Sequence, residues 1–264
     1  MATSLIGGLI DDGWGPEEIL VSDRDEGQQQ YLRGRFGVQV TDNNNEVVGR
    51  ASVVVFCVKP GSMAAAARGV AATLRARGAQ PLIVSIAAGV REHDIRRWLG
   101  YDAAVVRAMP NTPALVRSAA AALYANAFVN ESQRNQAESI LRAVGITLWF
   151  DDESLLDAAT ALSGSGPAYL FLWMEYMASA GERLGLSREA AHLLTLQTAF
   201  GAAKMALESA ESPSVLRARV TSAGGTTEQA LKVLQGSGLE QTFYEALDRA
   251  RERAVELGRL YGEK

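Results

Sequence analysis

The stretch Ser163-Gly164-Ser165-Gly166-Pro167-Ala168-Tyr169 is expected to open a helix, since Pro167 suits the first helical turn and Ser165 suits the N-cap. The residues that follow, Tyr169–Met177, are apolar except for Glu175. A helix that is apolar all round must be covered all round, and this one is far too short to cross a bilayer. We therefore expect it to form the core of a helical domain and to meet a second copy of the chain. Taken alone, the stretch fits a plain buried helix better.

Helical patterns fill the chain from Asp151 onward, where no strand signal is convincing. The change of pattern near Phe150–Asp152 predicts a domain boundary, with residues 1–150 in one domain and residues 151–264 in a helical one. The helices predicted in the second domain are Ser154–Leu162, Pro167–Leu184, Ser187–Ser209, Ser214–Val220, Thr226–Leu234 and Gln241–Leu260.

Short apolar strands alternate with helices in residues 1–150. Strands that are bounded by short loops and alternate with helices predict a mainly parallel sheet covered on both faces. We therefore expect an α/β dinucleotide-binding domain followed by an all-α domain. The predicted strands are Ile19–Ser22, Val38–Val40, Val53–Val58, Leu82–Ile86, Ala104–Ala108, Ala119–Tyr124 and Ile146–Phe150, and the helices include Glu26–Arg35, Ser62–Arg77, Glu92–Leu99 and Ser132–Val144.

A doubly wound, Rossmann-type sheet has a central first strand, whose glycine-rich turn holds a pyrophosphate with backbone N–H groups. This chain instead begins with the apolar helix Met1–Ile10. Ala2 fits the last small residue of a G-x-G-x-x-A fingerprint, and Asp23 fits the acidic residue expected about 20 residues further on. We therefore expect the first strand and the two leading glycines to be missing from this chain.

The composition excludes several classes of protein. The 264 residues carry a formal net charge of −4 and no basic tract, so nothing favours nucleic acid or an anionic membrane as a partner. Cys57 is the single cysteine, which excludes an intrachain disulfide and fits a reducing, cytoplasmic location. His93, His192 and Cys57 form no zinc-ligand pattern. We see no secretory signal and no transmembrane run.

Polar and glycine-containing turns follow four of the predicted strands. They are Ser22–Arg24, Asn43–Asn45, Cys57–Pro60 and Ile86–Gly89. Because ligands bind at the carboxyl ends of the strands in such sheets, we expect these turns to hold a dinucleotide. Arg24 can grip a 2′-phosphate, whereas Asp23 in the same turn suits a free ribose hydroxyl. The residues alone therefore leave NADP and NAD open.

A second anion site is predicted in the helical domain, where Thr221-Ser222-Ala223-Gly224-Gly225-Thr226-Thr227 opens a helix. Bare backbone N–H groups and the helix dipole favour an anion there, and a small carboxylate is the natural guest. Taken alone, the stretch is better explained as an ordinary capped helix start.

No strong acid or base is evident in the sequence. No Ser–His–Asp set and no acidic pair at a telling spacing can be named. Lys59 and Lys204 are candidate amines, and Cys57 is expected to be a small buried hydrophobe. A positioned cofactor and an anchored carboxylic acid are enough for hydride transfer, which we expect to be the reaction.

Six specific motifs occur in order along the chain: Val58–Pro60, Ser85–Val90, Arg107–Ala114, Ser163–Tyr169, Gly201–Met205 and Gly224–Thr227. With these motifs the sequence resembles pyrroline-5-carboxylate reductase, the last enzyme of proline biosynthesis, over essentially its whole length. The clear departure is the start, where Met1 and Ala2 correspond to the end of that family's glycine-rich turn.

The resemblance implies reduction of 1-pyrroline-5-carboxylate to L-proline by NADPH, with NADH as the alternative, in a homodimer that is sometimes stacked into larger rings. Thr227 is the implied catalytic residue, which would hydrogen-bond the ring nitrogen and act mainly by positioning. The implied cofactor contacts are Met1, Ser22, Arg24, Asn44, Cys57, Val58, Lys59, Pro60, Ile86, Ala87 and Ala88. The implied substrate contacts are Glu153, Ser222, Gly224, Gly225, Thr226 and Thr227.

Two other interpretations stay open at this point. A 3-hydroxyacid dehydrogenase of similar build needs a catalytic lysine, and Lys204 is the only candidate for it. A non-catalytic dimeric scaffold or sensor fits a chain that lacks the cofactor turn.

Overall fold

A computed structural model describes residues 1–263 of the chain, which fall into two compact units. The α/β unit comprises Met1–Ser165 and the chain from Arg249 onward, and the helical unit comprises Gly166–Asp248. These limits differ from the predicted boundary near Phe150–Asp152. The helical segments up to Ser165 and the end of the last helix belong to the α/β unit. The end of the strand pattern near residue 150 could not reveal this.

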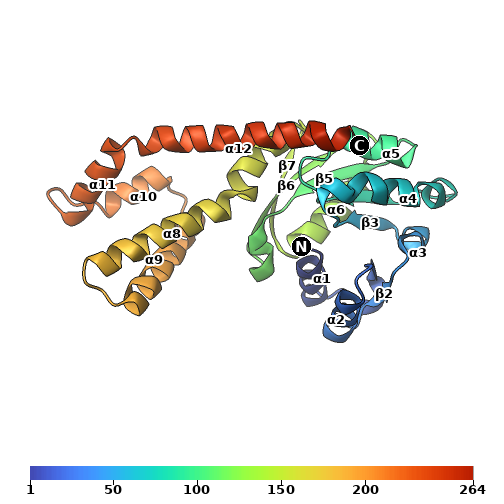
Figure 1. Cartoon of the computed structure of the whole chain (residues 1–264), viewed down its shortest axis with the longest axis horizontal. Coiled ribbons are helices and arrows are strands. Elements are labelled where there is room, and N and C mark those ends of the chain that lie inside the picture. Colours follow the sequence, from blue (N-terminus) through green and yellow to red (C-terminus); the bar gives the residue numbers. More distant parts are fainter. Residues whose placement is uncertain (264) are drawn as a thin grey trace. The chain divides into compact units, whose positions relative to one another are not determined.

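The α/β unit contains two sheets (Figure 1). All strand pairs are parallel except β5 with β6, which run antiparallel. The first sheet pairs β1 (Leu20–Ser22) with β2 (Gln39–Thr41), and the second has the order β3 (Val53–Phe56), β4 (Leu82–Ser85), β5 (Val105–Met109), β6 (Ala119–Ala125) and β7 (Gly145–Phe150).

Alternate residues of the larger sheet enter two separate cores. Ile83 and Val105 contribute to the core on one face, and Val84 and Val106 to the core on the other, as the period of two along a strand requires. The first face is covered by α3 (Asn44–Arg50), α4 (Met63–Arg75) and α5 (Glu92–Leu99), and the second by α1 (Ala2–Asp11) and α6 (Glu131–Arg142). Helix α2 (Glu26–Phe36) packs beside β2, and the 3-10 helices are Pro16–Glu18, Pro60–Ser62 and Thr112–Val116. The predicted α/β sheet covered on both faces is therefore confirmed.

The two sheets are not paired with each other within residues 1–263. The break lies between β1 and β3, where a doubly wound sheet has its central first strand. The hydroxyls of Ser4 in α1 and Ser22 at the end of β1 are buried without a hydrogen-bond partner in this part of the chain. The break agrees with the expectation that this sequence lacks the first strand.

The helix predicted from Pro167 is confirmed within one residue, because α8 spans Gly166–Arg183 and follows a bend at Ser165. Before the bend, helix α7 (Leu155–Ala159) is followed by a π-helical segment, Thr160–Gly164. Ser165 is not a side-chain N-cap, because its own N–H donates to the Thr160 carbonyl at 2.9 Å, the i to i−5 pattern of a π-helix. The Asn111 side-chain amide donates to the Ser163 carbonyl at 3.0 Å, which supports the widened turn from outside the helix.

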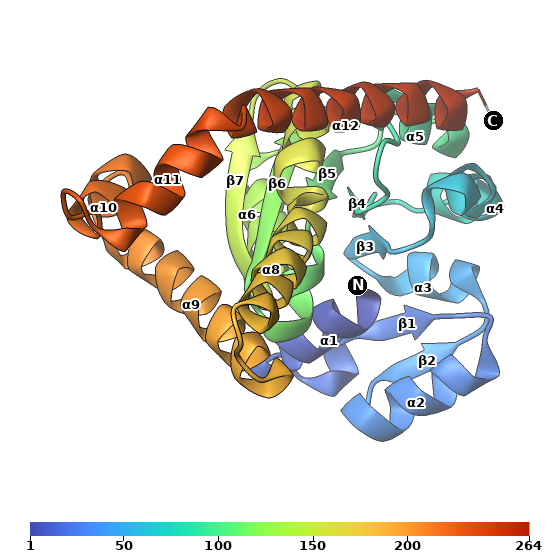
Figure 2. The same ribbon diagram turned by 60° about the vertical axis from the view of Figure 1, so that its left-hand side comes forward.

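The helical unit contains α8, α9 (Arg188–Glu208), α10 (Pro213–Arg219), α11 (Thr226–Gly236) and the first part of α12 (Leu239–Gly262). Helices α8 and α9 lie side by side (Figures 1 and 2), and the rings of Trp173 and Phe243 stack with their centroids 6.4 Å apart. The prediction that α8 is a core helix is wrong for the single chain, since none of its residues is buried and Phe171 is 64% exposed. Its apolar surface requires a partner outside this chain.

Two helical glycines of the α/β unit offer a matched test of the packing. A methyl group at Gly8 would lie 2.5 Å from the Ala143 carbonyl oxygen, whereas a methyl at Gly34 would have nothing within 4 Å. We expect Gly8→Ala to destabilise the fold by about 1–3 kcal/mol through overpacking. We expect Gly34→Ala to stabilise it by about 0.5–1 kcal/mol, because alanine is the better helix former. Urea unfolding measures both, and equal shifts of the midpoint would contradict the packing described for α1.

Candidate active site

The loops after β1, β3 and β4 hold the predicted cofactor residues. They contain Ser22–Arg24, Cys57–Pro60 and Ile86–Ala88, each directly at the carboxyl end of its strand. In open parallel sheets this edge is where ligands bind. The structure therefore gives these three segments the placement that the sequence predicted.

A cavity of about 410 Å³ lies beside the loop after β1. It is reached by Arg24, whose guanidinium has no ion pair with any carboxylate in residues 1–263. The buried, unpartnered hydroxyl of Ser22 lies at the end of the same strand. A free guanidinium and side-chain amides are donors that a phosphate needs, so Arg24 and the asparagines of the lining fit the 2′-phosphate end of NADPH. The lining residues are Arg24, Asp42, Asn43, Asn44, Asn45, Ala65, Ala66 and Gly69.

The other polar residues near this cavity are partly used by the fold. An Asp23 carboxylate oxygen accepts the Asp25 N–H at 3.0 Å, and Asn43 caps α3 by accepting the Asn45 N–H at 3.0 Å. Asn44 is half-buried and lines the cavity. Since Asp23 is engaged in the turn and Arg24 is not, the local geometry favours a phosphate over a free ribose hydroxyl.

The loop after β3 carries Cys57, Val58, Lys59 and Pro60. The expectation that Cys57 is buried is wrong, because the residue is exposed just past the end of β3. Lys59 is exposed and precedes the 3-10 helix that begins at Pro60.

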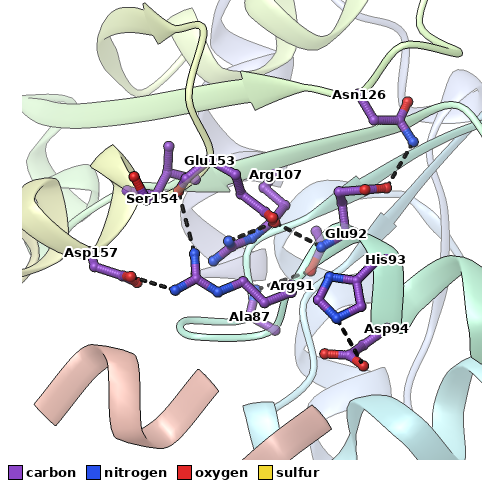
Figure 3. Close-up of polar contacts among 12 residues, drawn as sticks. Ala87, Arg91, Glu92, His93, Asp94, Arg107, Asn126, Glu153, Ser154 and Asp157 are labelled. Carbon is purple, nitrogen blue, oxygen red and sulfur yellow. Dashed lines mark hydrogen bonds and ion pairs between the residues drawn. The ribbon is translucent and has the colours of Figure 1, made fainter. Parts of the chain in front are cut away.

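Figure 3 shows a network of charged residues behind the loop of residues 86–91, between β4 and α5. One oxygen of Glu153, Oε1, accepts both the Glu92 N–H at 2.7 Å and the Arg107 Nη1 at 2.8 Å. Arg91, the last residue of the loop, pairs with Asp157 of α7. Among these residues, only Glu153 was predicted from the sequence to be a site residue.

The charges in this network are mutually compensated. Burial lowers the pKa of Arg107 and its ion pair with Glu153 opposes that shift, so the guanidinium remains charged. Burial also opposes ionisation of Glu92, but hydrogen bonds from Arg96 and Asn126 outweigh it and lower the pKa of that carboxyl. Burial, followed by the nearby carboxylates of Glu153 and Glu92, raises the pKa of Tyr124. Arg107 and Glu92 are therefore held in their charged forms within this network.

The remaining predicted substrate residues lie at the start of α11 in the helical unit. Gly225 is the N-cap, and Gly224 has a φ of 72°, a conformation that favours glycine. The Gly224 N–H already donates to Glu228 Oε2 at 3.0 Å, and the Gly225 N–H donates to the Ser222 carbonyl at 3.1 Å. These two N–H groups are therefore used within the loop, contrary to the expectation that they hold a carboxylate.

The N–H groups of the first turn of α11 remain available. The first hydrogen bond of this helix runs from the Gln229 N–H to the Gly225 carbonyl, so those of Thr226, Thr227 and Glu228 have no partner within the helix. Thr226 is exposed and Thr227 is half-buried. Of the residues predicted for the anion site, Thr226 and Thr227 therefore keep N–H groups without a partner in the helix, and Ser222 is exposed. Glu153 belongs to the other unit.

Sequence reasoning missed Arg91, Arg107, Asn126 and Asp157. Arg107 is the one with a signal, because it is a charged residue inside the apolar strand β5. A charge in a buried strand needs an oppositely charged partner, so Arg107 indicates an ion pair inside the fold. Asp157 offers no comparable signal, since an acidic residue in a first helical turn is ordinary.

Within residues 1–263, no cluster of histidine, cysteine and acidic side chains could hold a metal ion, and no helix is long and apolar enough to cross a membrane. A mainly parallel α/β sheet with polar loops at its carboxyl edge is the build of the dinucleotide-dependent oxidoreductases. Comparison with known proteins gives the family. Residues 1–89 match the NADP oxidoreductase family described as coenzyme F420-dependent, and residues 153–257 match the pyrroline-5-carboxylate reductase dimerisation family.

The chain is 51% identical to the pyrroline-5-carboxylate reductase of Pseudomonas aeruginosa over 263 residues, which cover 100% of this chain and 95% of the relative. It is 34% identical to the Escherichia coli enzyme, covering 98% of this chain and 95% of that one. The solved reductase of Coxiella burnetii superposes with a TM-score of 0.93 at 44% identity, covering 97% of this chain and 94% of that one. The Plasmodium falciparum enzyme with NADP bound superposes with a TM-score of 0.84 at 26% identity, covering 97% and 94%.

The chain belongs to the pyrroline-5-carboxylate reductase family. Its enzyme class, an NAD(P)H-dependent oxidoreductase, and its α/β unit followed by a helical dimerisation unit confirm the sequence predictions. The protein is a homodimer through the helical segment that matches the dimerisation family. This assembly explains why the apolar residues of α8 are exposed in one chain.

Proposed function

We propose that this chain reduces 1-pyrroline-5-carboxylate to L-proline with NADPH as the hydride donor. The observation that carries the proposal is the 51% identity to a pyrroline-5-carboxylate reductase over the whole chain. The phosphate-binding donors at Ser22 and Arg24 and the free N–H groups at Thr226 and Thr227 support it, because the reaction needs one site for a dinucleotide and one for a small carboxylate.

The cofactor residues divide into two groups in this proposal. Ser22, Arg24 and Asn44 hold the adenosine phosphate end, and Met1 lies at the start of α1, where the helix dipole favours the pyrophosphate. The loops after β3 and β4 hold the ribose and nicotinamide end, with contacts from Cys57, Val58, Lys59, Pro60, Ile86, Ala87 and Ala88.

The substrate is held by the start of α11 in this proposal. The N–H groups of Thr226 and Thr227 bind the carboxylate, while Ser222, Gly224 and Gly225 shape the turn. The Thr227 hydroxyl hydrogen-bonds the ring nitrogen and orients the C=N bond. Bound NADPH supplies a hydride to the C=N carbon, and solvent supplies the proton to the nitrogen, which together give proline.

The experiment that tests this function uses the purified chain with 1-pyrroline-5-carboxylate and NADPH. We expect the NADPH absorbance to fall and proline to accumulate in a one-to-one ratio. NADPH binding without proline formation would refute the proposed reaction, and formation of a 3-hydroxy acid product would favour the dehydrogenase alternative.

Lys204 allows the dehydrogenase alternative to be tested directly. Its side chain is exposed and lies 3.8 Å from Glu208 one helical turn away, an ordinary surface pair rather than a substrate contact. We expect Lys204→Ala to change kcat/KM by less than about twofold, since an exposed pair of this kind contributes little. A loss of imine reduction in this variant would restore Lys204 as a catalytic candidate.

The non-catalytic scaffold is not favoured, because the relatives that cover nearly the whole chain are named as reductases. The proposal also places the enzyme in the cytoplasm, which the single cysteine fits. Association of dimers into larger rings is part of the proposal, and light scattering after gel filtration distinguishes the dimer from a higher oligomer. Neither nucleic acid nor a membrane has a role in it.

A further inference from the structure

The loop of residues 86–91 is tied at its end to the connection between β7 and α7 (Figure 3). Glu153 accepts the Glu92 N–H at 2.7 Å from a position 61 residues further along the chain. Asp157 pairs with Arg91, and Arg91 Nη1 also donates to the Glu153 carbonyl at 3.4 Å. The end of this loop therefore has its place fixed by side chains of a distant segment.

Glu153 acts as an N-terminal cap for α5 that comes from outside the helix. The residue at the N-cap position is Arg91, which makes no side-chain capping bond. The first N–H groups of a helix have no partner inside it, and a carboxylate is favoured there by the helix dipole. Without Glu153, the start of α5 would lose the acceptor for the Glu92 N–H.

Arg107 in turn fixes Glu153 to the sheet. Its side chain is 5% exposed, lies in β5, and donates from Nη1 to the same Glu153 oxygen at 2.8 Å. A buried guanidinium needs a counter-charge, so the position of the Glu153 carboxylate is set by a strand between β4 and β6. The bonds thus run from the sheet through Glu153 to the cofactor loop.

Helix α12 contacts the same loop from another direction. Gly89 in the loop has a φ of 77°, and a methyl group on Gly258 of α12 would lie 2.9 Å from the Gly89 carbonyl oxygen. The two backbones therefore approach closely at a pair of glycines. Backbone packing at Gly89 and ion pairs at Arg91 and Glu92 together leave the loop little freedom.

We propose that Glu153 is a positioning residue. By holding the loop of residues 86–91, it fixes where the nicotinamide end of the cofactor lies. The inference rests on the proposed function, in which Ile86–Ala88 contact the cofactor. It assigns Glu153 to the cofactor side of the reaction rather than to the substrate. The Oε1 atom of Glu153 already accepts two hydrogen bonds from the protein, and both lead to the sheet or to this loop.

The test compares Glu153→Ala with Glu153→Gln. For Glu153→Ala we expect about a tenfold weaker Kd for NADPH and a kcat lower by about 10- to 100-fold, because small displacements of a reacting group are costly. The KM for 1-pyrroline-5-carboxylate stays within about twofold. Glu153→Gln restores most of both, since its amide oxygen can still accept the Glu92 N–H.

Hydrogen exchange gives a readout that does not depend on activity. The Glu92 amide exchanges at least about tenfold faster in Glu153→Ala than in the wild type and is protected again in Glu153→Gln. If Glu153→Ala fails to fold because Arg107 is left unpaired, the double variant Arg107→Met, Glu153→Met replaces the buried pair by apolar side chains. It is expected to fold and to show the same weak NADPH binding and fast exchange.

Asp94→Asn is the matched control. Asp94 is also a carboxylate of α5 with a side chain only 4% exposed, and it pairs with Arg97 at 2.8 Å without a bond to the loop. We expect its Kd for NADPH to be unchanged. A higher KM for the imine with unchanged NADPH affinity in Glu153→Ala would overturn the inference in favour of a substrate contact. If the wild type does not bind NADPH, the proposed function itself is refuted. If the wild type is active and Glu153→Ala has the same NADPH affinity and kcat, only this inference is overturned.

Discussion

Replacing Thr227 with valine is expected to lower kcat/KM for 1-pyrroline-5-carboxylate by about 10- to 100-fold, the cost of one hydrogen bond in the transition state. Valine keeps the shape of threonine and removes the hydroxyl that we assign to the ring nitrogen. Thr227 is half-buried in the first turn of α11, so the change leaves the helix backbone and its free N–H groups in place. Steady-state kinetics with saturating NADPH measures the effect.

Two companion variants distinguish the effect of losing the Thr227 hydroxyl from a general effect on the fold. Thr227→Ser keeps the hydroxyl and should recover most of the activity. Thr242→Val removes a hydroxyl of the first turn of α12 that donates to the carbonyl of Gly238 just before the helix, and it should leave kcat/KM unchanged. Since Thr227 is assigned to the substrate, the Kd for NADPH should not change in any of the three. Wild-type kinetics in Thr227→Val would remove this residue from the mechanism.

Local sequence signals were enough to place the helices and strands of the α/β unit. Helix α5 has the predicted limits, Glu92–Leu99, because Gly100 ends it in the left-handed conformation. Asn43, in the predicted turn Asn43–Asn45, caps α3 by accepting the Asn45 N–H with its side chain. Both signals act within a few residues, which is why one sequence suffices to read them.

Features that depend on distant partners were not predictable in this way. The π-helical turn before α8, Thr160–Gly164, had no local signal, because the Asn111 side chain supports it from outside the helix. The cap of α5 is equally hidden, since it comes from Glu153 across the fold. The apolar face of α8 is the exception, because a second copy of the chain was predicted to cover it and the match to the dimerisation family confirms the dimer.

The same distinction applies to the candidate site. The glycine and polar turns after the strands were found from sequence, since the carboxyl edge of a parallel sheet is fixed by topology. The sequence did not show which groups of these turns remain free for a ligand. Asp23 is engaged with the Asp25 N–H and the Gly224 and Gly225 N–H groups are used in their own turn. Those bonds remove candidates that residue type alone had kept.

Arg24 is expected to determine the choice between the two nicotinamide cofactors. Its guanidinium reaches the cavity beside β1 and has no ion pair with a carboxylate in the part of the chain that the structure describes. Charge-assisted hydrogen bonds to a phosphate contribute about 1.5–3 kcal/mol, so Arg24→Ala should lower kcat/KM for NADPH by about 10- to 150-fold. NADH lacks that phosphate, and its kcat/KM should change by less than about threefold. Kinetics with each cofactor, at fixed ionic strength, measures the ratio.

Arg33 provides the matched control for this change. It is an exposed arginine of α2 whose Nη2 donates to the Val40 carbonyl at 2.7 Å, so its guanidinium is already used by the fold. Arg33→Ala should leave the NADPH to NADH preference unchanged, although it removes the same charge from the same unit. A long-range effect of net charge would weaken NADPH equally in both variants and would vary with salt. Equal losses in Arg24→Ala and Arg33→Ala would therefore contradict a direct contact, whereas a loss confined to Arg24→Ala fits a phosphate bound by this one guanidinium.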